Sequence, residues 1–374
     1  MSGAASWTLC MSACTDEHTA LGRAGRASFE RLARARSGGS IAHRALQRIE
    51  STTADAALGC AETFDDEPRA RARAEVKSSG EHLASLVRSA RTRAGGGRLM
   101  LWVVGHGHEL GARVQVDAAT TGRRTARRPF ATIDVGGVSM EGASLGSALA
   151  GEAIDLLVLQ SCAQGAVETL ASVFERDAAR FVIASATQVP PPCEAIDAWS
   201  EGLPDGASEV AVFRAIAAAM RRALIETASG AQGWAATRGF ELTLASRDRW
   251  RSLSSALERV CSAIRDELSG RERAELWRWI ERGSSRAAPR GERVTLDDLC
   301  TQIRATRPAL AETLTEAIDE VFVARERGGD RARARAATLV ANPIIQRTHS
   351  EDFCERVGWF TALEGLSAHH GTNT

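Results

Sequence analysis

Leu99-Met-Leu-Trp-Val-Val104 and Ile154-Asp-Leu-Leu-Val-Leu159 are short, nearly continuous apolar runs, each bounded by glycine or polar residues. Such runs are typical of strands that are buried on both faces of a parallel sheet. A third run, Phe181-Val-Ile-Ala-Ser185, follows a segment with helical spacing over residues 165–176. Strand, helix and strand in this order form a right-handed crossover. The sequence therefore predicts an α/β fold with a mostly parallel sheet.

The neighbouring segments extend this pattern. Residues 7–13 form a further apolar run that predicts a strand, and helical spacing is found over residues 17–35, 41–57 and 79–93. Beyond residue 207 the pattern becomes largely helical, over residues 210–226, 252–268, 271–281, 295–303 and 308–326. We expect an α/β core over residues 1–205 and a mostly helical C-terminal region, residues 206–374, packed on it.

The composition limits the class of function. Of the 374 residues, 44% are hydrophobic and 25% are charged, as in a folded globular protein. Basic and acidic residues balance at 47 each, so no net charge attracts nucleic acid or an anionic membrane, and we expect neither as a partner. The N-terminus has no signal-peptide pattern, and no apolar run approaches the roughly 18 residues of a membrane span. The eight cysteines contain no CxxC pair, which favours buried thiols in a cytoplasmic protein.

Residues with catalytic chemistry follow the two central strands. Gly105-His106-Gly107 comes after the first strand, and Gln160-Ser161-Cys162 comes after the second. Ligands of open α/β sheets bind beyond the carboxyl ends of the strands. A thiol nucleophile needs a base, and the attacked carbonyl needs hydrogen-bond donors for its oxyanion. The pattern predicts Cys162 as nucleophile, His106 as general base, and the N–H groups of Gly107 and Cys162 as oxyanion donors. A helix that starts after the cysteine would favour its thiolate.

Two other kinds of site share these residues. His106-x-His108 on an extended segment would face one side, as the ligands of a metal-dependent hydrolase do, but no further histidine or acidic cluster completes the ligand set. Gly105, Gly107 and Gly111 partly match a dinucleotide-binding fingerprint, but the third glycine comes one residue late. We therefore predict no metal and no cofactor.

Beyond these two residues, the chain resembles the clostripain family of cysteine peptidases, which belongs to clan CD. Leu101-Trp102-Val-Val-Gly-His106-Gly107 resembles the family's "LILWNHG" block, and residues 154–165, with the following Ala166-Val167-Glu168, resemble "DLIGFDACLMG" and the helix after it. Weaker similarities cover residues 7–11, 78–83, 182–191, 295–299 and 365–367. The resemblance implies a caspase-hemoglobinase-like, mostly parallel sheet flanked by helices. It also implies an endopeptidase that cuts protein substrates through a thioester acyl-enzyme.

The resemblance also concerns the substrate residue before the cleaved bond, P1. The family carries Asp two residues before its cysteine, in the pocket (S1) that takes a P1 Arg or Lys, whereas this chain has Gln160 there. A carboxylate could come instead from Glu194 or Asp197, which follow the third strand. We expect cleavage after Arg, with Gln160, Glu194 and Asp197 as the candidate S1 residues. A calcium requirement like that of clostripain is left open.

A basic segment, Gly122-Arg-Arg-Thr-Ala-Arg-Arg-Pro129, lies between the two candidate catalytic residues. Clan CD enzymes often mature by cleavage in this interval, so the resemblance implies self-processing after Arg123, Arg124 or Arg127. Activation by an upstream protease is the alternative. Bacterial caspase-like proteases often act in proteolytic signalling or defence cascades, including antiviral defence, and we expect the same context here by analogy. The alternative from another class is a catalytically silent caspase-like scaffold that binds partner proteins.

Overall fold

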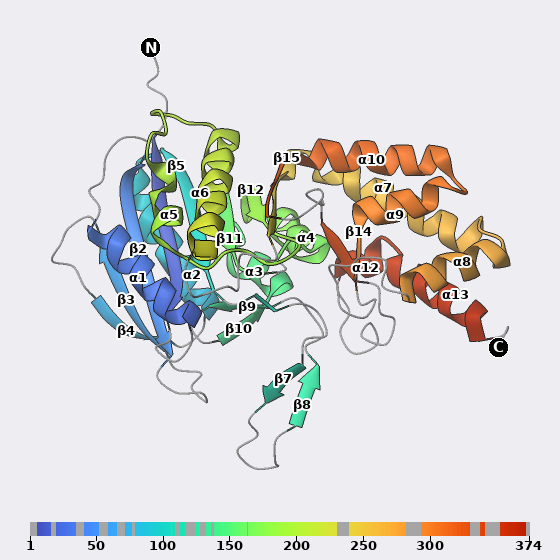
Figure 1. Cartoon of the computed structure of the whole chain (residues 1–374), viewed down its shortest axis with the longest axis horizontal. Helices are drawn as coiled ribbons and strands as arrows, with labels where there is room; N and C mark the ends of the chain where they lie inside the picture. The colour runs from blue at the N-terminus through green and yellow to red at the C-terminus, as the bar shows by residue number, and fades with distance from the viewer. Residues whose placement is uncertain are drawn as a thin grey trace.

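The computed structural model describes residues 6–15, 20–34, 41–51, 59–65, 72–76, 79–105, 107–108, 113–116, 124–127, 132–135, 138–162, 164–229, 239–281, 293–329, 337–340 and 352–371. A large sheet with helices on its two faces forms one half of the molecule, and a bundle of helices forms the other (Figure 1).

The large sheet has nine strands in the order β15-β13-β12-β11-β5-β1-β2-β3-β4. Its five central strands are parallel to one another: β12 (Ala179–Ala184), β11 (Ile154–Gln160), β5 (Arg98–Val104), β1 (Trp7–Thr15) and β2 (Ile41–Ser51). Antiparallel strands complete each edge, with β13 (Phe240–Ser246) and β15 (Phe322–Gly328) beside β12, and β3 (Gly59–Asp65) and β4 (Ala72–Val76) beside β2. The predicted α/β fold is confirmed.

The continuous apolar runs arise because both faces of the central strands are covered. Side chains alternate between the faces of a strand. Met100, Trp102 and Val158 pack on the side of α1 (Ala20–Arg34), α5 (Glu194–Asp197) and α6 (Glu209–Ser229). Leu101 and Leu157 pack on the opposite side, with α2 (Ser79–Ala94), α3 (Gly142–Ala148) and α4 (Val167–Glu175). The middle of β5 and the middle of β11 are therefore apolar on both faces.

The C-terminal helices share a core with the second of these faces. They are α7 (Trp250–Asp266), α8 (Gly270–Glu281), α9 (Leu296–Arg304), α10 (Pro308–Val321), α12 (Asp352–Arg356) and α13 (Trp359–Gly371). A two-stranded antiparallel sheet, β14 (Arg293–Thr295) with β16 (Thr338–Val340), joins them. The division at residues 205 and 206 stays a prediction. Beyond it, α6, β13 and β15 belong to the sheet half of the molecule (Figure 1).

Two helix predictions are wrong. Residues 41–57 were expected to be helical, but the chain forms β2 over Ile41–Ser51, and the helix expected to run to residue 326 ends at Val321, where β15 takes over. Strand β13 had no counterpart among the predicted elements. In each case the neighbouring strand offers a free edge, and pairing with that edge outweighs the helical preference of Ala, Leu, Arg and Glu.

The segment between Gly105 and α3 forms short strands outside the large sheet. β6 (Gly107–His108), β9 (Thr132–Val135) and β10 (Val138–Glu141) form a three-stranded sheet, and β7 (Arg113–Val116) pairs with β8 (Arg124–Arg127) as a separate two-stranded ribbon. This ribbon projects away from the rest of the molecule (Figure 1).

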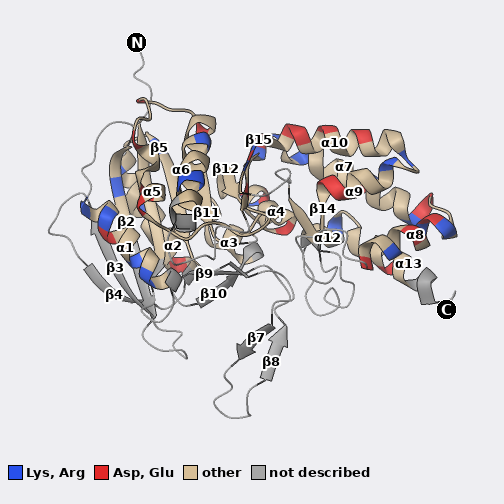
Figure 2. Ribbon diagram, in the orientation of Figure 1, with Lys and Arg blue, Asp and Glu red and all other residues tan. Residues whose placement is uncertain are grey.

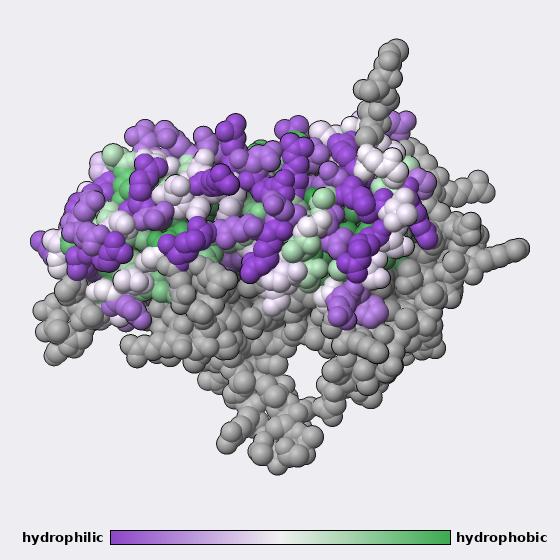
Figure 3. Space-filling model, turned by 180° about the vertical axis from the view of Figure 1, so that it is seen from behind, coloured by the Kyte–Doolittle hydropathy of each residue, from purple (hydrophilic) through white to green (hydrophobic). Residues whose placement is uncertain are grey.

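Charged residues are distributed unevenly over the C-terminal helices. Helix α8 carries both basic and acidic residues, whereas the charged residues of α10 are all acidic (Figure 2). The face seen from behind is mostly hydrophilic where it is described (Figure 3). Across the described ranges, no helix combines the length and the apolar character that crossing a membrane would need.

The close crossing of α3 and α4 generates the first prediction. A Cβ atom on Gly146 would lie 2.0 Å from the carbonyl oxygen of Ser172 on α4. We expect Gly146→Ala to push the two helices apart and to lower the free energy of unfolding by about 1–3 kcal/mol. Denaturant unfolding measures this. Gly270→Ala is the matched control, since a Cβ there meets nothing within 4 Å, and equal stability of the two variants would contradict the prediction.

Candidate active site

The candidate site is built at the carboxyl ends of two adjacent parallel strands. β5 and β11 pair in register, and their last paired residues are Val104 and Gln160. The next residues, Gly105 and Ser161, are both buried. The Ser161 hydroxyl donates a hydrogen bond to the Gly105 carbonyl oxygen at 2.9 Å. The two chain segments are therefore joined directly at the point where they leave the sheet.

The two predicted catalytic residues come next on these segments. Cys162 follows Ser161, in a turn at the end of β11. His106 follows Gly105 but itself lies outside the described residues, so the His106–Cys162 contact stays a prediction. Gly107 is described as part of β6, where it pairs with Ile133. The backbone of the histidine segment is therefore placed on both sides of His106.

Exposure distinguishes Cys162 from most other described cysteines. Cys162 and Cys193 are partly exposed, whereas Cys10, Cys261, Cys300 and Cys354 are buried. Burial raises the pKa of Cys261 to about 12 and that of Cys300 to about 11, and it raises the pKa of Cys10 as well. These three thiols stay protonated and inert at neutral pH. Reactive cysteines need partial exposure and access to a thiolate form, and Cys162 meets the first condition.

The turn that carries Cys162 is held at its far end by Gly165. The Gly165 N–H donates to the Ser185 carbonyl oxygen at 2.7 Å, just past the end of β12. A Cβ atom on residue 165 would lie 2.6 Å from the backbone nitrogen of Ala186, so only glycine allows this approach. Within the turn, the Gln164 side chain donates to the Cys162 carbonyl oxygen at 3.1 Å.

Helix α4 follows this turn. It begins at Val167 with Ala166 as its N-cap, so several residues separate its N-terminus from Cys162. Its first turn contains Glu168, which is buried. The expected support of a thiolate by the positive end of this helix stays a prediction.

Gln160, the candidate S1 residue that ends β11, is buried with only 3% of its surface exposed. Its Oε1 accepts a hydrogen bond from the Trp102 indole at 2.9 Å, and its Nε2 donates to the Pro190 carbonyl oxygen at 3.2 Å. Trp102 in turn packs on Trp199, with ring centroids 5.5 Å apart. The oxygen and the nitrogen of the Gln160 amide therefore both make hydrogen bonds within the protein.

The two candidate acids of the S1 pocket differ in their surroundings. Asp197 accepts hydrogen bonds from the Ser28 hydroxyl and from Arg31 Nε on α1, the latter at 2.7 Å. Burial raises the pKa of Asp197 above its usual range, although the bonds to Ser28 and Arg31 act in the opposite direction. Glu194, the first residue of α5, is exposed. Of the two carboxylates, Glu194 is the one available to a ligand from solvent.

The other predicted residues are only partly described. Arg124 and Arg127 lie on β8, and their backbones pair with Val116 and Arg113 of β7, whereas Arg123 lies outside the described residues. His108 is described only by its backbone, in β6. Within the described parts of the chain, no three His, Cys, Asp or Glu residues cluster as a metal site, and the calcium question stays open.

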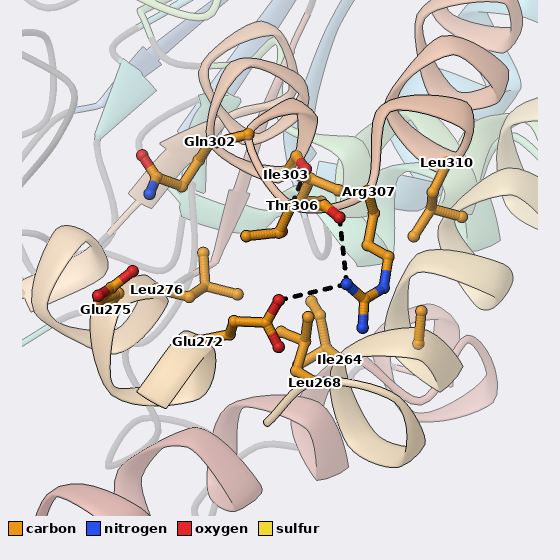
Figure 4. A pocket seen from close by; sticks show the side chains of 12 residues that line it. Ile264, Leu268, Glu272, Glu275, Leu276, Gln302, Ile303, Thr306, Arg307 and Leu310 are labelled. Atoms are coloured by element: carbon orange, nitrogen blue, oxygen red, sulfur yellow. Dashed lines mark hydrogen bonds and ion pairs between the residues drawn. The ribbon is translucent and has the colours of Figure 1, made fainter. Parts of the chain in front are cut away.

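A small pocket lies elsewhere, between helices α7, α8, α9 and α10 (Figure 4). Its floor is apolar, and Arg307 reaches across it to Glu272 with an N–O distance of 3.2 Å. Glu272 also accepts from the Ser269 N–H at 2.8 Å at the start of α8, and these contacts hold the pKa of its carboxyl below the usual range. The side chains that line this pocket contact neighbouring helices and the start of α8. The pocket is separate from the strand ends that carry Cys162.

Comparison with solved structures places this arrangement among known folds. The chain is similar to a secreted C11 cysteine protease from Bacteroides thetaiotaomicron, solved with an irreversible peptide inhibitor, with a TM-score of 0.58 and 13% identity over 97% of this chain and 99% of that one. It is also similar to an inactive zymogen C11 protease from Parabacteroides distasonis, with a TM-score of 0.56 and 11% identity over 96% of this chain and 99% of that one. A further similar structure is that of "iotapain", a secreted C11 cysteine protease from Bacteroides thetaiotaomicron, with a TM-score of 0.57 and 10% identity over 96% of this chain and 99% of that one.

This chain has the fold of the C11 cysteine proteases. The expected likeness to clostripain-like peptidases is thereby confirmed at the level of the fold. No family model matches the sequence, and no curated protein matches it by sequence.

Several contacts of the candidate site carried no signal in the sequence that assigned them a role. Ser161 stood inside the cysteine motif, but its bond to Gly105 depends on the register of β5 with β11. In the sequence, Trp102 has the pattern of an ordinary buried strand residue, and nothing there indicates that its indole donates a hydrogen bond to Gln160. Gly165 also stood inside the cysteine motif, but its close approach to the backbone of Ala186 depends on where β12 ends.

The second prediction concerns this glycine. We expect Gly165→Ala to displace the Cys162 turn from β12, since its Cβ would overlap backbone atoms of Ser185 and Ala186 that have no room to move. Cys162 should then be alkylated by iodoacetamide at a clearly different rate, and the free energy of unfolding should fall by about 1–3 kcal/mol. Gly365→Ala in α13 is the control, because a Cβ there meets nothing within 4 Å. An unchanged alkylation rate in Gly165→Ala would contradict the described turn.

Proposed function

We propose that this protein is a cysteine endopeptidase that cuts protein substrates with Cys162 as nucleophile and His106 as general base. One observation carries the proposal: Ser161 and Gly105, the residues directly before these two, are hydrogen-bonded at the ends of adjacent parallel strands. The C11-like fold over nearly the whole chain supports the same assignment. The two side chains thus start from neighbouring points at the edge of the sheet where α/β proteins bind ligands.

The proposed reaction has two stages. The Cys162 thiolate attacks the carbonyl carbon of the scissile peptide bond, after His106 has taken the thiol proton. His106 then gives this proton to the leaving amine, which departs and leaves a thioester acyl-enzyme. Water then attacks the thioester carbonyl while His106 takes a proton from it. The carbon–sulfur bond breaks, the product leaves with a new carboxyl group, and His106 returns the proton to the Cys162 thiolate.

The oxyanion of each tetrahedral intermediate needs preorganised donors. We assign this role to the backbone N–H groups of Gly107 and Cys162. The turn around Cys162 is held at both ends, by Ser161 and by Gly165, which supports a fixed direction for the Cys162 N–H. Removal of a single oxyanion donor in other enzymes costs about 10²–10³ in kcat.

Arginine is the P1 residue that we propose, and Glu194 is the carboxylate that we assign to it. Gln160 cannot neutralise a guanidinium, and its amide already bonds to Trp102 and Pro190. Asp197 is already paired with Arg31. The exposed Glu194 lies on the same side of the sheet as Gln160, four residues after Pro190. Gln160 would then shape the pocket without contributing charge.

The context of the activity is part of the same proposal. We propose that the enzyme is made as a zymogen, is processed between its two catalytic residues by itself or by an upstream protease, and acts in a bacterial signalling or defence cascade in the cytoplasm. One structural neighbour is described as an inactive zymogen, which supports the first element, and another as secreted, which makes the compartment a point to test.

The third prediction tests the catalytic pair. With fluorogenic peptides that differ only at P1, we expect the wild type to prefer Arg, and Cys162→Ala to lose about a thousandfold or more of its turnover. His106→Ala should lose about 10²–10⁴-fold, as expected for a general base. The controls are Cys193→Ser, the other partly exposed cysteine described, and His43→Ala, an exposed histidine on β2. Turnover that persists in Cys162→Ala would refute the mechanism, and no turnover by any form would favour the silent scaffold.

The fourth prediction tests self-processing. Incubated wild type should yield two fragments with a new C-terminus at Arg123, Arg124 or Arg127, as read by intact-mass spectrometry, whereas Cys162→Ala should stay whole. Cleavage after Arg124 or Arg127 should be slower than after Arg123, because proteases need an extended, unpaired segment and the backbones of Arg124 and Arg127 pair with Val116 and Arg113. Changing all three arginines to Ala should block the cut, and Arg113→Ala on the opposite strand should not. If purified Cys162→Ala also yields these fragments, a different protease makes the cut.

A further inference from the structure

The turn that carries Cys162 has contacts to a part of the chain more than 170 residues away. The Thr338 N–H donates to the Gly165 carbonyl oxygen at 3.0 Å, and Ala166 and Thr338 form an isolated parallel bridge. Gly165 thus bonds to β12 through its N–H and to β16 through its carbonyl oxygen. The end of the nucleophile turn lies between these two segments.

Strand β16 is itself attached firmly to the C-terminal region. It pairs with β14, and the Leu296 N–H donates to the Ala337 carbonyl oxygen at 3.0 Å. Ala337, Thr338 and Leu339 are all at most 3% exposed. The hydrogen bond between Thr338 and Gly165 is therefore shielded from water, where such a bond is stronger than at the surface.

The helix after the turn is held by the same region. The Cys354 thiol on α12 donates to Glu168 Oε1 at 3.8 Å, in the first turn of α4. At the other end of α4, Glu175 accepts hydrogen bonds from the Trp250 indole at 3.3 Å and from Arg356. Trp250 also packs between Phe174 of α4 and Phe353 of α12, with centroid separations of 5.3 and 5.5 Å. Helix α4 therefore cannot shift without disturbing α7 and α12.

We propose that β16 is a positioning element of the proposed active site, and that the Thr338 N–H, by holding the Gly165 carbonyl, sets where the Cys162 turn lies. Only residues 161–164 separate Gln160, at the end of β11, from Gly165. A segment this short between two held ends has few conformations. The bond to Thr338 is the anchor that comes from outside the sheet half of the molecule, so the C-terminal region controls the nucleophile through it. The inference rests on the proposed function for its catalytic meaning.

The test uses the full-length protein with Thr338 changed to Pro, which removes the N–H that donates to Gly165. Thr338→Val is the matched control, because it keeps the N–H and the β-branched shape. Three quantities are measured: amide hydrogen exchange over residues 161–166, the pH profile of Cys162 alkylation resolved by peptide mass spectrometry, and kcat and KM on the preferred P1 peptide. Far-UV circular dichroism checks folding.

We expect Thr338→Pro to speed exchange over residues 161–166 by about tenfold, as the loss of one shielded hydrogen bond implies. Its kcat should fall while KM stays near that of the wild type, and the pH profile of its Cys162 alkylation should differ from that of the wild type. Thr338→Val should match the wild type in all three. A folded Thr338→Pro with wild-type exchange, or with faster exchange but unchanged kcat and alkylation, would overturn the proposal.

Two further outcomes are also decisive. If Thr338→Pro does not fold, the proposal is tested by amide hydrogen exchange of the wild type in low denaturant. The Gly165 and Thr338 amides should open with the same free energy and the same denaturant dependence. Openings that differ in either quantity would overturn the proposal. If the wild type has no peptidase activity, the proposed function fails. The exchange and alkylation measurements then still show whether β16 positions Cys162.

Discussion

The parallel pairing of β5 with β11 is the constraint on which the rest of the site depends. It brings the carboxyl ends of two strands that are far apart in sequence to adjacent positions, and both strands stop at the same level, at Val104 and Gln160. The buried hydrogen bond from Ser161 to Gly105 then joins the two segments one residue further on. Whatever His106 and Cys162 do, they start from this shared edge. A slip of one residue in the register would turn every side chain of one of these strands to the opposite face of the sheet.

The site is supported by layers that differ in their chemistry. Beneath their ends, strands β5 and β11 are apolar on both faces over Leu99–Val104 and Leu156–Leu159. On one face Gln160 closes this layer by bonding to Trp102 and Pro190, and on the other α4 is packed against the C-terminal helices. Buried polar groups that are fully bonded make a rigid support. Such a support suits a thiol that has to meet a substrate carbonyl in one orientation.

The C-terminal region is more than a helical addition to an α/β core. Strands β13 and β15 extend the large sheet, β16 contacts the turn of the candidate nucleophile, and α12 holds both ends of the following helix. The hydrophobic core runs without a break from the sheet into the C-terminal helices. A change in this region can therefore reach Cys162 through packed backbone and buried hydrogen bonds, with no need for direct contact with a substrate.

Sequence alone was sufficient for strands β1, β5, β11 and β12 and for most of the helices. It also predicts a His and a Cys directly after β5 and β11, and their catalytic role stays a prediction. These features are local: an apolar run bounded by glycine reads as a buried strand, and His or Cys directly after it stands at the ligand-binding edge. Only the tertiary structure decided that residues 41–51 form a strand, that Gln160 is committed to Trp102 and Pro190, that Asp197 is paired with Arg31, and that Thr338 bonds to Gly165. Each of these depends on a partner distant in sequence, and a pattern within one segment carries no information about which remote backbone or side chain will complete its hydrogen bonds.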